Sequence, residues 1–485
     1  MAVQLRNPDR LYIAGQWVSS LDGSPIEVIS PDTEEVVFRV AGAGPRDMDK
    51  AVDAAREAFD GGPWSTMPVS DRLAMLKRMA DALDRREAEL AAAWSMQMGG
   101  LAAMAGFAAQ RGTQNLRDAI AAGEHFPFDV RVDSPFADEA RVIHEAVGVI
   151  AAITPWNVPY KLMMAKVSPA LVAGCTVIMK PAPETPVEAY IIAECAEEAG
   201  LPPGVINLVP SDREAADHLM RNARVDKIAF TGSTAVGRQI AQVCGENIRR
   251  FTLELGGKSA AIVLDDMPVA EAAKILTSTI VTVSGQICAM LTRAIVSRHR
   301  YDELAAAIAE EMKQVRIGHS DDPQAQMGPL ASARQRERVE HYIAVGVAEG
   351  ATVLTGGKRP AEPGRGFFFE PTLFTGVTND MTIAREEIFG PVLCLIACED
   401  VEDAVRIAND TIYGLNASVL THDSAAAAAI ARKLRTGTFA QNGLRTDFSL
   451  PWGGFKQSGI GREGGEKGLL SYLETKTVLL DAVAG

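Results

Sequence analysis

The chain has 485 residues, 47% of them hydrophobic and 23% charged, and a formal net charge of -14. This length predicts two or three domains, since a domain typically holds about 100–200 residues. The acidic charge argues against a nucleic-acid binder and against a protein that coats anionic membranes, because both bind through clustered Lys and Arg.

The first part of the chain predicts short strands followed by helices. In residues 11–42, turn-forming residues such as Gly15 and Asp22-Gly23 interrupt the apolar runs, as they do between short strands. Apolar residues then recur at helical spacing from Met48 to Phe59, and residues 70–123 are rich in strong helix formers. We expect two or three packed helices in that second stretch.

Strands and helices alternate after Val147. The predicted strands are 147–153, 175–179, 205–209 and 226–230, and the predicted helices are 187–199, 215–222 and 231–243. Such alternation predicts a parallel sheet covered on both faces, with ligands bound at the carboxyl ends of its strands.

A second alternating region covers roughly residues 260–440. Its predicted strands are 260–264, 294–296 and 392–397, and its predicted helices are 301–315 and 334–349. Residues 470–482 alternate again and predict an edge strand. Neither an internal repeat nor a long linker is visible, so we expect the domains to pack closely.

The six cysteines and seven histidines are scattered, with no C-x-x-C and no H-x-x-x-H pair. The sequence therefore predicts neither a disulfide framework nor a metal site. The N-terminal residues show no signal-peptide pattern, and the apolar runs are shorter than a membrane span. We expect a cytoplasmic protein with reduced thiols and no membrane partner.

Two features suit an anionic ligand, although each also has a plain structural interpretation. Gly232 and Ser233 follow a predicted strand and open a helix, whose free N–H groups suit a pyrophosphate. Ser233 could equally be an ordinary helix cap. Lys180 ends another strand and would face the ligand crevice, but a solvated lysine is also common there.

Two further residues are candidates for catalysis. Glu254 lies between two leucines in an apolar strand, where burial would raise its pKa and make it a usable base; a structural ion pair is the other interpretation. Cys288 follows Gly285-Gln286 at a predicted helix start, which would lower its thiol pKa. Most cysteines are instead small buried hydrophobes, and that interpretation fits the other five.

The ordered combination of motifs is far more specific than any one of them. From about residue 10 to residue 480 the chain resembles the aldehyde dehydrogenase superfamily, of the hydrolytic type that does not acylate CoA. The resemblance rests on Thr154-Pro155-Trp156-Asn157-Val158-Pro159, Lys180-Pro181-Ala182, Phe230-Thr231-Gly232-Ser233, Leu253-Glu254-Leu255-Gly256-Gly257-Lys258, Gly285-Gln286-Ile287-Cys288, Glu387-Ile388-Phe389-Gly390-Pro391 and Gly461-Arg462-Glu463.

The resemblance implies an α/β fold with three parts. Residues 1–123 and 147–256 would form a Rossmann-type nicotinamide-cofactor domain, and residues 257–455 an α/β catalytic domain. Residues 124–146 and 456–485 would form a small β arm that bridges subunits of a homodimer or homotetramer.

The resemblance also implies the chemistry. Cys288 would attack the aldehyde carbonyl, and the Asn157 amide with the Cys288 N–H would hold the oxyanion of the thiohemiacetal. After hydride transfer, water activated by Glu254 would hydrolyse the thioester. Lys166 and Glu463 match positions that support proton transfer.

By the same resemblance the cofactor is NAD, with NADP as the alternative. Many NAD-preferring members carry a glutamate where this chain has Pro183, and losing that carboxylate removes one source of repulsion against a 2′-phosphate. A charged turn, Ser211-Asp212-Arg213-Glu214, also replaces a glycine-rich one. The implied cofactor-binding residues are Ile153, Thr154, Pro155, Trp156, Lys180, Pro183, Gly232, Ser233, Leu255, Glu387 and Phe389.

The substrate pocket is implied less sharply, because loops supply most of it. It suits a medium aliphatic or aromatic aldehyde, or an acidic semialdehyde if Arg445 points inward. The implied lining residues are Val158, Lys161, Leu162, Ala165, Ile287, Ala289, Arg445, Phe448 and Trp452.

Two other functions stay open from the sequence. A CoA-acylating semialdehyde dehydrogenase would share the nucleophile, but such members generally do not use the glutamate base. A non-catalytic binding or structural protein could share the fold, although Cys288, Glu254 and Asn157 occurring together argue against it. An esterase activity would be secondary.

Overall fold

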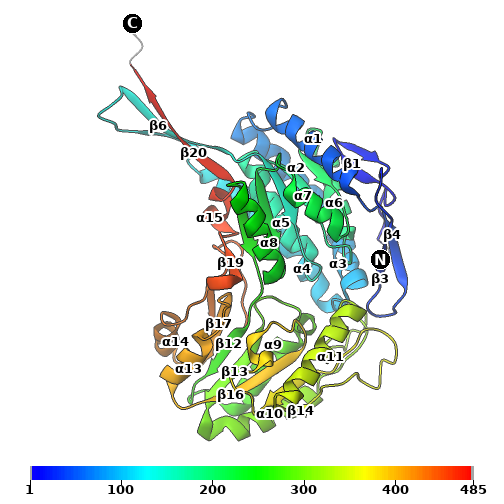
Figure 1. The fold of residues 1–485 in the computed structure, drawn as a ribbon, viewed down its shortest axis with the longest axis vertical. Helices are drawn as coiled ribbons and strands as arrows, with labels where there is room; N and C mark the ends of the chain where they lie inside the picture. The colour runs from blue at the N-terminus through cyan, green and yellow to red at the C-terminus, as the bar shows by residue number, and fades with distance from the viewer. Residues whose placement is uncertain (1–2, 482–485) are drawn as a thin grey trace.

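The computed structural model describes residues 3–481 and contains two α/β lobes and a projecting β arm (Figure 1). The upper lobe holds an eight-stranded sheet of order β19-β11-β10-β7-β8-β9-β1-β2, whose middle five strands are parallel. Its strands are β1 (Leu11–Ile13), β2 (Gln16–Val18), β7 (Val149–Ile153), β8 (Thr176–Lys180), β9 (Ile206–Leu208), β10 (Lys227–Thr231), β11 (Arg250–Glu254) and β19 (Gly459–Ile460).

Helices cover both faces of this sheet. Its buried apolar residues fall into two large clusters, one shared with α2, α5 and α6 and the other with α1, α7 and α8. The helices are α1 (Pro45–Asp60), α2 (Val69–Arg85), α3 (Glu87–Met98), α4 (Ala102–His125), α5 (Pro159–Ala173), α6 (Val187–Glu198), α7 (Arg213–Arg221), α8 (Thr234–Glu246) and α15 (Gly465–Leu470). The parallel sheet covered on both faces is confirmed.

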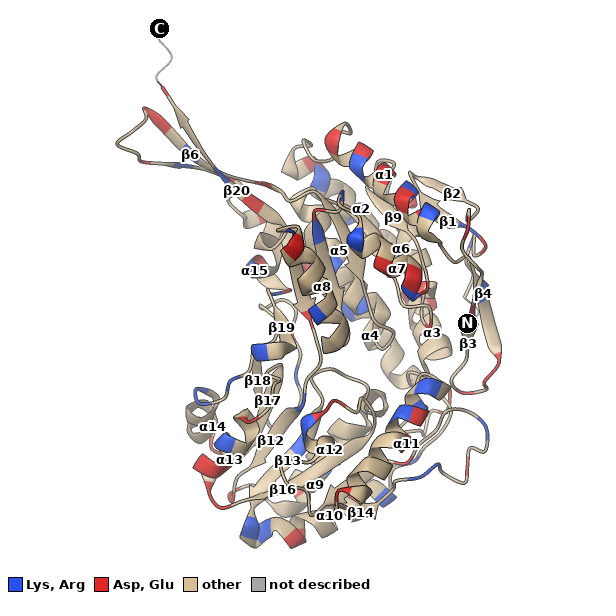
Figure 2. Cartoon of the chain, in the orientation of Figure 1, with Lys and Arg blue, Asp and Glu red and all other residues tan. Residues whose placement is uncertain are grey.

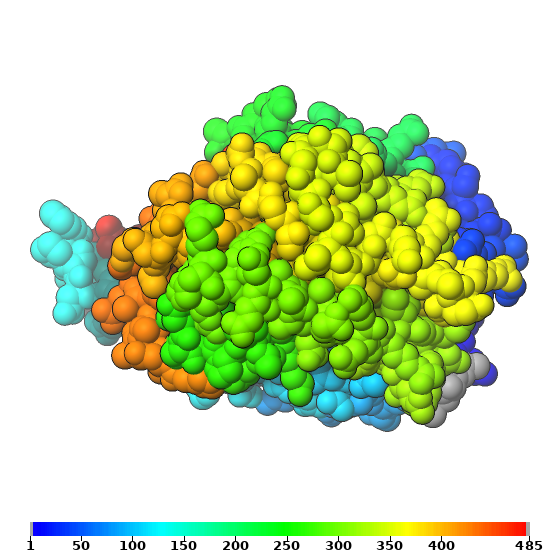
Figure 3. All heavy atoms as spheres, turned by 90° about the horizontal axis from the view of Figure 1, so that it is seen from below, coloured from blue at the N-terminus to red at the C-terminus, as the bar shows by residue number. Residues whose placement is uncertain are grey.

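The lower lobe holds a seven-stranded sheet of order β14-β15-β16-β13-β12-β17-β18, parallel except for the β14–β15 pair. Its surface occupies most of the face seen from below in Figure 3. The strands are β12 (Ser259–Val263), β13 (Leu291–Ser297), β14 (Thr352–Thr355), β15 (Thr372–Thr375), β16 (Val392–Cys398), β17 (Asn416–Leu420) and β18 (Thr438–Gln441). The helices are α9 (Val269–Val281), α10 (Tyr301–Lys313), α11 (Ala333–Ala348), α12 (Thr382–Arg385), α13 (Val401–Asn409) and α14 (Ser424–Ala431). Three short 3-10 helices are η1 (Thr282–Gly285) after α9, η2 (Arg298–Arg300) after β13 and η3 (Lys456–Ser458) before β19.

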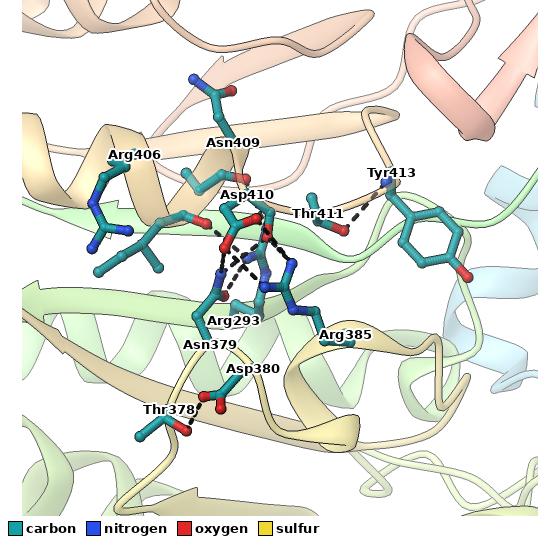
Figure 4. A network of polar contacts seen from close by, with 12 residues as sticks. Arg293, Thr378, Asn379, Asp380, Arg385, Arg406, Asn409, Asp410, Thr411 and Tyr413 are labelled. Atoms are coloured by element: carbon teal, nitrogen blue, oxygen red, sulfur yellow. Dashed lines mark hydrogen bonds and ion pairs between the residues drawn. The ribbon is translucent and has the colours of Figure 1, made fainter.

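One buried arginine ties several elements of the lower lobe together. Arg293 on β13 is fully buried and donates hydrogen bonds to the carbonyls of Lys258, Ile407 and Ala408 and to the side chain of Asn379. Figure 4 shows this guanidinium beside the Arg385–Asp410 ion pair. The residue before β12 and the last turn of α13 are thereby held by one side chain.

The arm is an antiparallel sheet of order β20-β6-β5 that projects from the upper lobe (Figure 1). Its strands are β5 (Asp129–Val132), β6 (Glu139–Ala146) and β20 (Leu473–Leu480), and a separate hairpin pairs β3 (Ile26–Ile29) with β4 (Val36–Val40). The edge strand predicted at 470–482 is β20, although residues 482–485 lie outside the described part.

The segment 456–485, predicted to belong wholly to the arm, is divided in the structure. β19 pairs with β11 in the upper sheet, and α15 packs on α4 and α5. Of the described residues in this segment, only those of β20 belong to the arm. The difference arises because β19 completes hydrogen bonds at the edge of β11, next to Glu254.

Helix α5 is absent from the sequence prediction. All but one of its fifteen residues are buried, so it lacks the polar face by which an amphipathic helix is recognised. Among the described residues, no helix has both the length and the apolarity needed to cross a bilayer.

Candidate active site

Two cavities meet at Cys288. One, of about 350 Å³, is lined by residues at the carboxyl ends of β10 and β11 together with Glu387 and Phe389. The other, of about 250 Å³, lies against α4 and α5. Both are lined by Asn157, Leu162, Thr231, Glu254 and Cys288. A group on Cys288 can therefore be reached from two sides.

The loop before Cys288 is shaped by left-handed backbone. Val283, Ser284 and Gly285 have φ values of 52°, 53° and 73° in succession. A β-carbon at Gly285 would lie 2.1 Å from the carbonyl oxygen of Gly390, so only glycine allows this close approach. Gln286 fixes the loop, because its amide donates to the Val283 carbonyl (3.0 Å) and accepts from the Ala331 N–H (2.9 Å).

The predicted helix start at Cys288 is wrong. η1 ends at Gly285, and Cys288 lies in a turn before β13. Burial raises the pKa of its thiol to about 12, and the carboxyl groups of Glu387 and Glu254 act in the same direction. Lys161 and a backbone N–H oppose them. The expected lowering of the pKa by a helix is therefore also wrong, because no helix begins there.

Asn157 follows β7 and reaches the same loop. The side-chain amide of Asn157 donates to the Gln286 carbonyl at 2.8 Å. The backbone carbonyl of Asn157 accepts from the Trp94 indole at 2.9 Å. Two contacts from separate elements thus hold the buried amide beside Cys288, with its second N–H still available to a ligand in the cavities.

Glu254 and Glu463 lie on adjacent segments, and Lys166 reaches both from α5. Lys166 is fully buried, donates to Thr231 Oγ1 at 2.6 Å and forms an ion pair with Glu463. Within residues 3–481 neither carboxylate oxygen of Glu254 has a hydrogen-bond partner. Burial, and then Glu463, raise the pKa of Glu254 well above its usual value, while Lys166 and Arg462 oppose the shift.

The larger cavity fits a dinucleotide. Gly232 and Ser233 lie at the start of the thirteen-residue helix α8, where N–H groups and the helix dipole favour a phosphate. Trp156 and Phe389 pack edge-to-face with ring centroids 5.3 Å apart along the cavity. At the end near Cys288, Glu387 accepts from the Gly257 N–H at 3.1 Å. Its second oxygen can accept from a sugar hydroxyl.

Seven of the predicted cofactor-binding residues line this cavity, and four do not. The lining residues are Pro155, Trp156, Gly232, Ser233, Leu255, Glu387 and Phe389. Ile153, Thr154, Lys180 and Pro183 are absent from the described lining. Ile153 and Lys180 still end adjacent strands at the same edge of the sheet. Burial lowers the pKa of Lys180 to about 8, against the influence of Glu184 and Asp212.

The smaller cavity has an apolar wall formed by most of the predicted pocket residues. Leu162, Ala289, Phe448 and Trp452 form a buried cluster, and Phe448 and Trp452 stack with ring centroids 5.1 Å apart. Val158, Ile287 and Lys161 also line the cavity. Ala165 belongs to the cluster but faces a separate small cavity.

Arg445, an expected pocket residue, is exposed and does not line the cavity, so Arg445 does not meet the condition that it point inward toward an acidic semialdehyde. The loop around Arg445 places its neighbours Leu444 and Thr446 in the cavity wall instead. Three further residues, Arg111, Trp94 and Phe107, reach the cavity from α3 and α4 without having been predicted. No local motif marks these helix residues; only the packing of α4 on α5 brings them there.

Arginines of the larger cavity were also not identified as site residues. Arg213 begins α7 after its cap Asp212, in the charged turn already noted for its departure from the family. Arg334 pairs with Glu184 at 2.6 Å, and Arg338 donates to the Glu387 carbonyl at 2.6 Å.

Comparison with known proteins shows which family the chain belongs to. The model of the aldehyde dehydrogenase family matches residues 17–478. The chain belongs to the aldehyde dehydrogenase family.

Several relatives extend over the whole chain. Geranial dehydrogenase of Castellaniella defragrans is 41% identical, with 97% of this chain and 98% of the relative covered. A Mycobacterium tuberculosis aldehyde dehydrogenase complexed with NAD+ has a TM-score of 0.94 at 41% identity, covering 97% and 98% of the two chains. A mutant aldehyde dehydrogenase C of Pseudomonas syringae, complexed with NAD+ and octanal, has a TM-score of 0.94 at 38% identity, covering 100% and 99%.

The predicted aldehyde dehydrogenase family, the α/β fold class and the assignment as an enzyme of this family are confirmed. The roles of individual residues stay predictions, and so do the bounds of the three predicted parts, apart from the segment 456–485 that the structure divides. The larger cavity lies where a parallel α/β sheet is expected to bind its ligand, at the carboxyl ends of the strands.

Proposed function

We propose that this aldehyde dehydrogenase oxidises an aldehyde to a carboxylate with NAD+, through a thioester on Cys288 that water hydrolyses. The observation that carries the proposal is the position of Cys288 at the junction of two cavities, with Asn157 and Glu254 lining both. One cavity would hold the cofactor and the other the aldehyde.

The larger cavity suits NAD+ at both of its ends. The start of α8 and Arg213 face one part of it, and Glu387 the part near Cys288. Bound there, NAD+ accepts the hydride that leaves the aldehyde carbon. The complexes of two relatives with NAD+ support this choice.

NADP is the alternative because Pro183 supplies no carboxylate to repel a 2′-phosphate. We favour NAD+, since Glu184 and Asp212 place negative charge near Lys180. The preference is measured by kcat/KM for each cofactor with one aldehyde, and a higher value for NADP+ would contradict it.

The chain's own groups supply the rest of the chemistry. The Cys288 thiol releases its proton to solvent and its sulfur adds to the aldehyde carbon, while the carbonyl oxygen becomes an oxyanion that the Asn157 amide and the Cys288 N–H stabilise. Losing one such donor typically costs about 10²–10³ in rate. After hydride has left, Cys288 holds the acyl group as a thioester.

Glu254 is the proposed base for hydrolysis. Burial raises its pKa toward the range in which a carboxylate can take a proton from water, and Lys166 with Glu463 lies beside it to pass that proton on. Water then adds to the thioester carbon, the C–S bond breaks, and the proton that Glu254 and the Lys166–Glu463 pair took from the water goes to the leaving Cys288 sulfur.

The CoA-acylating alternative is less well supported, because transfer of the acyl group to CoA does not need Glu254 to activate water. A non-catalytic protein is also less well supported, since such a protein would have no reason to bury an unpaired carboxyl beside a cysteine. The apolar wall of the smaller cavity favours an aldehyde with an aliphatic or aromatic body. The six free thiols suit a reducing compartment such as the cytoplasm.

The test compares wild type with Cys288→Ala and Glu254→Gln. We expect wild type to form NADH and carboxylate without CoA. Cys288→Ala should lose at least about 10³-fold in kcat and still bind NAD+. Glu254→Gln should form about one equivalent of NADH rapidly and then stall as the acyl-enzyme, visible as a mass increase on Cys288. Unchanged oxidation by Cys288→Ala would refute the nucleophile.

A further inference from the structure

We infer that the substrate carries a carboxylate at the end remote from its aldehyde, bound by Lys161 with help from Arg111. The inference rests on the proposed aldehyde oxidation and names the class of aldehyde: an ω-oxo carboxylate with an apolar middle.

Lys161 lies in the first turn of α5 and lines the smaller cavity. Its ammonium donates to Thr446 Oγ1 at 3.2 Å and lies 4.3 Å from the centroid of the Phe448 ring. In the described part of the chain no carboxylate forms an ion pair with it. A cation whose protein partners are a hydroxyl and an aromatic face can still accept an anion from a ligand.

Asp447 acts on both Lys161 and Arg111, so two cations face one nearby carboxylate and a net positive charge is left in this part of the cavity. Arg111 also lines it and meets Asp447 only at 3.7 Å. Of the two carboxyl groups in the lining, Glu463 is already paired with Lys166, and Glu254 is buried in a setting that favours its neutral form. Burial, and then Arg111, lower the pKa of Lys161 to about 8, which a bound carboxylate would reverse.

The positions of these cations fix which end of the substrate they meet. Phe107, which is 67% exposed, and the partly exposed Arg111 form the outer part of the cavity. Cys288 forms its inner end, and the Phe448–Trp452 stack belongs to the wall between them. Lys161 lies close enough to both Arg111 and Cys288 for each of them to influence its pKa, so a chain of suitable length along that wall brings the far end of an aldehyde at Cys288 to the Lys161 ammonium.

The experiment measures kcat/KM for ω-oxo carboxylates of increasing chain length and for n-alkanals of the same length. The quantity compared is the ratio of the two values at each length. Effects on Cys288, on NAD+ binding or on folding act on both aldehydes and cancel in that ratio. Wild type should prefer the ω-oxo carboxylate at one chain length, and added salt should weaken the preference.

Three variants isolate the cation. Lys161→Met keeps the bulk of the side chain and should lower the ratio about 10- to 100-fold, the range expected for a lost charge-assisted contact, while alkanal oxidation continues. Lys161→Arg should keep most of the preference. Arg445→Met removes the exposed neighbouring cation and should leave the ratio within about twofold.

Each other outcome overturns the inference. A wild type that prefers alkanals at every length, an equal loss for both aldehydes in Lys161→Met, or a loss of preference in Arg445→Met would do so. Failure of the proposed function is distinct, since wild type would then oxidise neither series although Cys288 could still be alkylated.

Discussion

The Cys288 thiol lies between the carboxyl groups of Glu387 and Glu254 and is raised to a pKa of about 12, chiefly by burial. In the protein without ligands the thiol is therefore protonated at neutral pH. Alkylation by iodoacetamide requires the thiolate. We expect the labelling rate at Cys288 to rise about tenfold per pH unit from about pH 7 to about pH 9, without a plateau.

Mass spectrometry of labelled peptides provides the measurement, with Cys288→Ser as the background. The other five cysteines are buried and should label only slowly. A plateau below about pH 8 would mean that Lys161 and the Ala289 N–H outweigh burial, contrary to the expected direction.

For single residues, the sequence predicts which residues belong to the site better than it predicts the backbone and charges around each of them. Composition and local pattern gave Cys288 little advantage over five other cysteines; the ordered motifs selected it. Its environment was predicted wrongly, because three successive left-handed residues before it have no sequence signal beyond Gly285. Arg445 shows the same limit, since the conformation of its loop decides whether it faces the cavity.

Among the elements, those with a clear period were predicted well. Strands β7, β8, β10 and β16 lie where alternation and apolar runs placed them, within a few residues. Helix α5 was absent from the prediction because burial on all sides removes the period. The residues it contributes to the site, Lys161, Leu162 and Lys166, could be found only through the motif that begins at Thr154.

Arg293 provides a stability prediction for the lower lobe. Arg293→Met would leave three buried carbonyls and the Asn379 side chain without their donor, because a thioether cannot replace a guanidinium. We expect the free energy of unfolding to fall by about 3–5 kcal/mol, measured by urea denaturation.

The matched control is Arg298→Met, which removes an exposed arginine directly after the same strand. Its partner Glu399 is also exposed, and such pairs contribute about 0–1 kcal/mol. An equal loss in both variants would show that the buried network adds nothing beyond a surface ion pair.

The whole molecule was predicted at the level of its α/β class and its alternating strands and helices, because hydrophobic period and alternation are properties of long segments. The division of residues 456–485 between the upper lobe and the arm was not predicted. β19 is only two residues long and pairs far away in the sequence with β11, and no local pattern carries such a contact. The position of Glu463 beside Lys166 depends on that return of the chain.

The arm gives the last prediction. It projects from the upper lobe and carries charges of both signs (Figure 2), while Val132, Phe136, Leu479 and Leu480 expose apolar surface. β20 and β5 also leave outer edges that pair with no described strand. We expect the arm to bury this surface and an edge against a second copy of the chain, in a homodimer or homotetramer.

Leu479→Glu should weaken that assembly, because it places a carboxylate among the apolar side chains of the arm. We expect the dissociation constant to rise about tenfold or more, measured by sedimentation across protein concentrations. Val347→Glu, on an exposed site of α11 in the lower lobe, is the matched control and should leave assembly unchanged. A wild type that sediments as a monomer at every concentration would contradict the prediction, as would equal weakening by both variants. Loss of assembly only in Leu479→Glu would place the contact on the arm and exclude the face around α11.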